Sequence, residues 1–248
     1  MPVSAEENFP AEASPVADSV DFVMENAVYV GSEQEPAVRT TTTFHQGVVY
    51  DDMKSPAETI VFTPEAGRFV VLDHARQTRS ELTTAEVATL TRRIAKRSAE
   101  HKSPYVRFLG APELSEEWDP DTGQLLLGSR WLIYQVDARR PQPASIAREY
   151  AEFADSYSQL NAMLNPGGIP PMARMKLNSV LAQAGLIPRT LELTLRPSGR
   201  DDESVVRLRS EHRLKPVDDE ARGRIAKARQ AMREYEPVRF RPPSKPAQ

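Results

Sequence analysis

The first third of the chain is a series of short β-rich segments separated by tight turns, and this pattern constrains the fold more than any other feature. Valine, threonine and aromatic residues favour strands, and they are concentrated at 20–30, 37–50, 58–62, 68–72 and 77–82. A parallel pair of strands needs a crossover of roughly a dozen residues or more, and the intervals here are shorter. The sequence therefore predicts an antiparallel meander.

Strand signals return in the second half of the chain, at 113–118, 124–129, 130–138, 190–196 and 204–214. In the last of these segments, alternate positions are charged and share one predicted wet face: Arg207, Arg209, Glu211 and Arg213. About nine to eleven strands in one open sheet are expected to curl. The predicted fold class is α+β, a large curved antiparallel sheet shaped like a half-barrel, with about four helices against its concave side.

The helices are predicted from caps and from apolar periodicity. Thr83 and Glu86 form a capping box that begins a helix at 84–101. The clearest signal lies at 144–164, where six side chains recur at spacings of three and four: Ile146, Tyr150, Phe153, Tyr157, Leu160 and Leu164. A helix at 171–185 follows, so the two are expected to form a helical hairpin against the sheet, and a last helix is predicted at 218–235.

We expect one domain at 19–236, because no internal repeat and no Gly/Ser-rich linker interrupts the chain. Residues 1–18 are predicted to be a disordered N-terminal segment, and 237–248 a disordered, basic, Pro-rich tail. No apolar run approaches the length of a transmembrane helix. Residues 1–18 lack the features of a signal peptide, so we expect a periplasmic or exported protein if a signal was removed, and otherwise a cytoplasmic one. The oligomeric state is left open.

Several classes of function are excluded by what the sequence lacks. There is no cysteine, and the four histidines, including His101, do not have the spacing of metal ligands. No nucleophile elbow and no Gly-rich phosphate loop occurs. We therefore assign no catalytic residue, metal or cofactor. The first 67 residues carry twelve acids and two bases, and no basic run of five follows, so nucleic acid is not an expected partner.

Three stretches carry a resemblance to a known family: GVVYD at 47–51, ETIVFTPEAGRFVVLD at 58–73 and YVRFLGAPELSEEWDPDTGQLLL at 105–127. They resemble uncharacterised proteins of planctomycete-type bacteria, most of them exported, and the resemblance covers roughly 20–240. It brings no known activity and no functional residues. The strand–turn–strand pattern is also similar to the periplasmic lipoprotein-carrier fold, which implies a curved antiparallel sheet around an apolar cavity.

Three functional hypotheses follow. The first is a non-catalytic binding or carrier protein that holds a lipid, or another apolar or lipoprotein-like ligand, between sheet and helices. Its candidate ligand-binding residues, which could equally be core, are Tyr150, Phe153, Tyr157 and Leu193. The second is an interaction or scaffold protein that docks a partner on an exposed sheet face or edge. The third is a hydrolase with a dispersed site, which needs at least two of these residues to converge: His45, His74, His212, Asp73 and Glu211.

Overall fold

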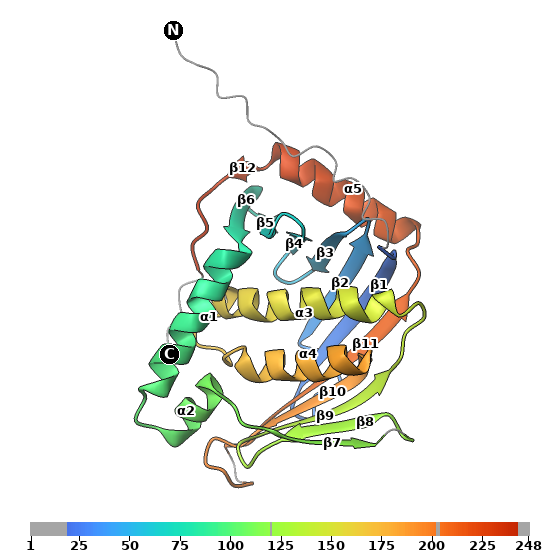
Figure 1. Ribbon diagram of the computed structural model, residues 1–248. Coiled ribbons are helices and arrows are strands. Elements are labelled where there is room, and N and C mark those ends of the chain that lie inside the picture. Colours follow the sequence, from blue (N-terminus) through green and yellow to red (C-terminus); the bar gives the residue numbers. More distant parts are fainter. Residues whose placement is uncertain (1–18, 120, 202–203, 243–248) are drawn as a thin grey trace.

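A single open sheet of twelve strands organises the protein (Figure 1). The computed structural model describes residues 19–119, 121–201 and 204–242. The strands are β1 (Phe22–Val30), β2 (Val38–His45), β3 (Val48–Met53), β4 (Glu58–Thr63), β5 (Arg68–Asp73), β6 (Thr78–Thr83), β7 (Ser115–Asp119), β8 (Gln124–Gly128), β9 (Leu132–Arg139), β10 (Ile187–Leu195), β11 (Val206–Lys215) and β12 (Glu236–Pro237). Their order is β12-β6-β5-β4-β3-β2-β1-β11-β10-β9-β8-β7. Every neighbouring pair is antiparallel except β12 with β6, which confirms the predicted fold class.

The described residues contain five helices, one more than expected: α1 (Thr84–Ala99), α2 (Pro104–Gly110), α3 (Ser145–Leu164), α4 (Met172–Ala184) and α5 (Asp219–Glu234). The sheet bends around α3 and α4, which lie side by side with α1 on one of its faces (Figure 1). The predicted helical hairpin is therefore confirmed. Among the described residues, no helix is long and apolar enough to cross a membrane.

The prediction of a single long strand at 37–50 is wrong, because this segment forms two strands, β2 and β3, joined by a two-residue hairpin. His45 pairs with Val48 across the turn. Gln46 and Gly47 have φ values of 52° and 75°, the left-handed conformation that such hairpin turns require at both positions. The meander β1 to β6 therefore contains one more reversal than expected.

The face of the sheet that α3 and α4 cover carries two apolar clusters. The α3 cluster centres on Phe22, Phe44 and Phe153, with Phe22 stacked on Phe44 at a ring-centroid distance of 4.1 Å and Phe153 edge-on to Phe44 at 5.7 Å. The α4 cluster holds Leu177 against leucines of β8, β9 and β10. Buried apolar side chains of this kind supply most of the stabilisation of a domain.

Helix α5 covers a small part of the opposite face. Alternation within the strands places Tyr50, Val61 and Val70 on this side, where they pack against Ile225 and the alanines of α5. Because α5 packs on β3, β4 and β5, no helix among the described residues covers the same face of β1, β2 and β11.

The residues that follow the predicted domain boundary at 236 contact β6 and the α3 cluster. Val238 donates a backbone hydrogen bond to the carbonyl of Arg79 at 2.8 Å, and Phe240 packs against the α3 cluster. Residues 237–240 thus lie along β6, and the predicted tail at 237–248 stays a prediction. The predicted disorder of 1–18 and 243–248 falls outside the described residues.

Candidate functional site

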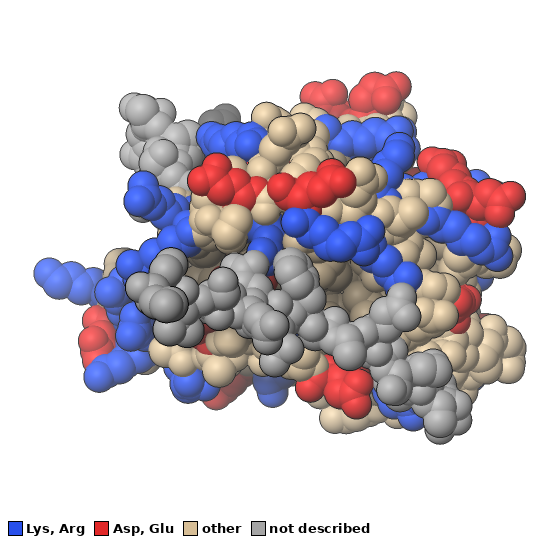
Figure 2. Space-filling view, turned by 90° about the horizontal axis from the view of Figure 1, so that it is seen from above, with Lys and Arg blue, Asp and Glu red and all other residues tan. Residues whose placement is uncertain are grey.

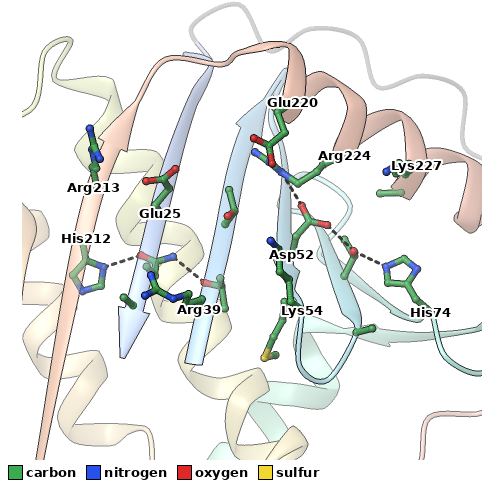
Figure 3. Close-up of a pocket in the computed structure, with 18 of the residues that line it drawn as sticks. Glu25, Arg39, Asp52, Lys54, His74, His212, Arg213, Glu220, Arg224 and Lys227 are labelled. Atoms are coloured by element: carbon green, nitrogen blue, oxygen red, sulfur yellow. Dashed lines mark hydrogen bonds and ion pairs between the residues drawn. The ribbon is translucent and has the colours of Figure 1, made fainter. Parts of the chain in front are cut away.

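A cleft of about 1520 Å³ lies beneath α5, on the sheet face opposite α3 and α4. Strands β1, β2, β3, β10 and β11 form its floor and α5 forms one wall (Figure 3). We call it the α5 cleft, and its charged or titratable lining residues are Glu25, Arg39, Asp52, Lys54, His74, Arg139, Arg189, Glu211, His212, Arg213, Glu220, Arg224, Lys227, Glu234 and Tyr235.

The period-two alternation of the strands explains why this floor is polar. On β1, Met24 is buried in the α3 cluster, so Glu25 points to the cleft. On β11, Leu214 packs against the α3 cluster while Glu211 and Arg213 line the cleft. The charged face that the sequence predicts for β11 is therefore confirmed, and it is the signal that locates this floor.

More lysines and arginines than aspartates and glutamates line the cleft. Four of its five carboxylates form ion pairs: Glu25 with Lys215, Glu211 with Arg209, and both Asp52 and Glu220 with Arg224, while Glu234 accepts a hydrogen bond from Gln230. Five lining cations form no ion pair with any described residue: Arg39, Lys54, Arg139, Arg213 and Lys227. Figure 2, seen from above, shows acidic and basic side chains interspersed over the surface.

Buried polar atoms in the cleft wall lack hydrogen-bond partners. Asp52 Oδ2 lies 3.7 Å from Arg224 Nε, too far for a hydrogen bond. Both atoms are buried without a partner among the described residues, as is Arg139 Nε. Burial raises the pKa of Asp52 above its usual range, against the opposing effects of its Thr59 hydrogen bond and of Arg224. Such unused hydrogen-bonding capacity is rare in folded proteins and calls for a role.

A chain of hydrogen bonds connects the end of α5 to the floor. The Tyr235 hydroxyl lies 2.9 Å from His74 Nδ1, and His74 Nε2 lies 2.8 Å from Thr59 Oγ1. Thr59 in turn donates to Asp52 Oδ1 at 2.7 Å. These four residues come from α5, β3, β4 and the end of β5, so the chain runs across one end of the α5 cleft, and Figure 3 shows its part from His74 to Asp52.

His212 is also among the residues that line the cleft (Figure 3), but its side chain lies on the α3 face of β11, where its ring meets Tyr150 edge-on at a centroid distance of 6.5 Å, and it belongs to a separate polar network. Its Nδ1 lies 2.8 Å from Asn26 Oδ1, and Asn26 donates to Thr40 and Thr42. Burial, helped by Arg174, lowers the pKa of His212 to about 3, so the ring is neutral at pH 7. Neutral His212 donates through Nδ1, which leaves a buried Nε2 lone pair without a partner among the described residues.

The residues predicted as sites from sequence are distributed differently. Tyr150, Phe153 and Tyr157 belong to the α3 cluster and Leu193 to the α4 cluster, so the four do not share one location, and none lines the α5 cleft.

Of the five residues proposed for a dispersed hydrolase site, three line the α5 cleft: His74, His212 and Glu211. The other two lie elsewhere, His45 beside Asp21 at 2.6 Å and Asp73 beside Arg76 at 3.1 Å. Within the described ranges, no group of three or more His, Asp and Glu side chains is placed to hold a metal ion.

Comparison with known proteins provides no role to transfer. No model of a known protein family matches the chain, and no curated protein matches it in sequence. The resemblances to planctomycete-type proteins and to the lipoprotein-carrier fold stay predictions.

Proposed function

We propose that this protein binds an anionic ligand in the α5 cleft. The observation that carries the proposal is the set of cleft cations that form no ion pair with a described residue, three of which are arginines on strands: Arg39, Arg139 and Arg213. Arginine presents a planar fork of donors that matches carboxylate and phosphate groups in two-point contact. A ligand with carboxylate or phosphate groups would supply negative charge to pair with these arginines.

The arrangement of the cations favours a ligand with more than one anionic group. Arg213 stands directly across from Glu25 of β1, and Arg39 stands across from Ala27 of the same strand. Lys54 and Lys227 lie toward the α5 side (Figure 3). At about 1520 Å³, the cleft exceeds the roughly 300–1,000 Å³ of ordinary small-molecule sites, so an extended polyanion fits its size.

An apolar ligand, as predicted from sequence, has a different place in this fold. It would sit between the sheet and the helices α3 and α4, where Phe22, Phe44 and Phe153 are in ring contact. The α5 cleft, with charged side chains on floor and wall, does not favour it. The carrier, scaffold and hydrolase hypotheses all remain predictions.

Isothermal titration with phosphate, citrate and a short polyglutamate peptide tests the proposal. We expect at least one of these anions to bind, and more weakly as salt rises because the contact is electrostatic. Arg39→Gln with Arg213→Gln should weaken that binding about tenfold or more, since charge-assisted hydrogen bonds are lost.

The matched control replaces two exposed arginines of α1, Arg93→Gln with Arg97→Gln, which removes the same charge away from the cleft. Its affinity should equal that of the unmodified protein. The proposal fails if none of the anions binds, or if both double variants lose affinity equally.

A further inference from the structure

We infer that Tyr235 is a general base at the α5 end of the cleft, with His74, Thr59 and Asp52 relaying its proton into the sheet. This activity goes beyond ligand binding, because it would let the protein remove a proton from a bound molecule. The inference stands on the three consecutive contacts from Tyr235 to Asp52, at 2.9, 2.8 and 2.7 Å. Tyr235 and His74 both line the cleft.

The donor and acceptor of every hydrogen bond in the relay can be assigned by starting from Asp52, its buried end. An ionised Asp52 can only accept, and Thr59 has a single proton, which it donates to Asp52. The contact between Thr59 and His74 Nε2 must then use the proton on Nε2. A neutral imidazole has its second nitrogen free to accept, so Tyr235 donates to His74 Nδ1. All donors therefore point from Tyr235 toward Asp52.

This uniform direction allows a balanced proton transfer. The Tyr235 oxygen takes a proton from the bound molecule while its own proton moves to His74 Nδ1. The Nε2 proton of His74 moves to Thr59, and the Thr59 proton moves to Asp52 Oδ1. The negative charge leaves Asp52 and appears on the bound molecule, and the reverse sequence restores the relay.

The charged and buried groups around the relay favour both the arrival of the proton at Asp52 and its removal from the bound molecule. Asp52 is a competent proton acceptor because burial makes its ionised form less favourable. The charged groups that face Asp52 are Arg224 and Lys227 of α5, besides His74. At the cleft end, the cations without an ion pair can stabilise the charge that develops on the bound molecule.

A purely structural reading is that the same contacts only fasten the end of α5 to β4 and β5. Under that reading, Tyr235→Phe would lower stability and nothing else. In the proposed relay, by contrast, only Tyr235 touches the bound molecule, and His74, Thr59 and Asp52 act through it as positioning residues. The two readings therefore differ in what they predict for proton transfer.

The test uses 5-nitrobenzisoxazole, an uncharged probe whose C3 proton goes to a base as its N–O bond breaks to give a coloured cyanophenolate. Because the probe has no charge, its reaction does not depend on the proposed binding of anions. General base catalysis contributes about 10²–10⁴-fold, so we expect the protein to accelerate the reaction at least about 100-fold over buffer.

Two substitutions should bring the rate to that of buffer: Tyr235→Phe, which removes the hydroxyl, and Asp52→Asn, which keeps an acceptor for Thr59 but cannot take its proton. The control Tyr105→Phe on α2, outside the cleft, should react like the unmodified protein. Circular dichroism establishes that each variant is folded. A rate equal to buffer, or one retained by folded Tyr235→Phe, would overturn the inference.

A second measurement does not depend on the variants. Nitrogen-15 NMR of the unmodified protein at about pH 8 should show His74 protonated on Nε2 and unprotonated on Nδ1. The opposite tautomer would reverse the donors and end the proposed relay.

Discussion

Asp51 provides the sharpest test of how this sheet packs against α3. It lies on β3 among the fully buried residues and accepts a hydrogen bond from Thr42 at 2.6 Å. Burial raises the pKa of Asp51 from 3.8 to about 6, although the Thr42 hydrogen bond opposes the shift. Burial, together with the Asp51 carboxyl group, raises the pKa of Tyr157 on α3.

The sign and size of the effect on stability follow from this shift. The folded protein holds the Asp51 proton more tightly than the unfolded chain does, so the favourable contribution is complete below about pH 3.8. It is lost as the pH rises through about 6. A difference of roughly two pKa units corresponds to about 3 kcal/mol, which is the expected cost of ionising Asp51 at pH 7 in the free energy of unfolding.

The variant Asp51→Asn removes the ionisation and keeps an oxygen that accepts from Thr42. We expect its free energy of unfolding, relative to the unmodified protein, to increase by about 2 kcal/mol between pH 4 and pH 7. Urea denaturation across this range measures the difference. Other groups titrate in both proteins and largely cancel. A difference that is the same at every pH would refute the assignment of a raised pKa to a buried Asp51.

Further predictions concern packing, caps and ligands. Leu177→Ala should cost about 2–5 kcal/mol in urea denaturation, because Leu177 is fully buried in the α4 cluster; a cost below about 1 kcal/mol would contradict that packing. Gly110→Ala should destabilise by about 1–3 kcal/mol, since its Cβ would lie 2.3 Å from Ser98 Cβ; an unchanged melting temperature would contradict this close approach. Thr83→Ala should cost about 1 kcal/mol through loss of the capping box with Glu86, and an equal urea midpoint would argue against it. Native mass spectrometry checks the predicted carrier function, which requires a co-purifying lipid and loses its support if the protein is free of lipid.

Much of the fold was predictable because its signals are local. The stripe that includes Ile146, Phe153 and Leu160 fixes the buried face of α3, and all three are buried. The short helix α2 was not predicted, since seven residues are too few to show a helical period. The hairpin at Gln46–Gly47 was hidden inside a run of β-favouring residues.

The candidate site was less predictable because it depends on distant contacts. The alternation on β11 indicates which of its side chains face water, but not that α5 turns this face into a cleft. The buried side of α5 is mostly alanine, apart from Ile225, and so weak an apolar signal does not say which sheet face it covers. His74 and Tyr235 are 161 residues apart, and no local pattern predicts that they meet.

NMR titration of the isotope-labelled protein with whichever anion binds in calorimetry tests the central claim, that the α5 cleft is the functional site. We predict that signals of cleft residues such as Arg39, Arg213 and Lys227 shift in a saturable way. Signals of Arg93 and Arg97 on α1 should remain in place. If the largest shifts instead fall on α1, or between the sheet and α3, the ligand binds elsewhere and the claim is contradicted.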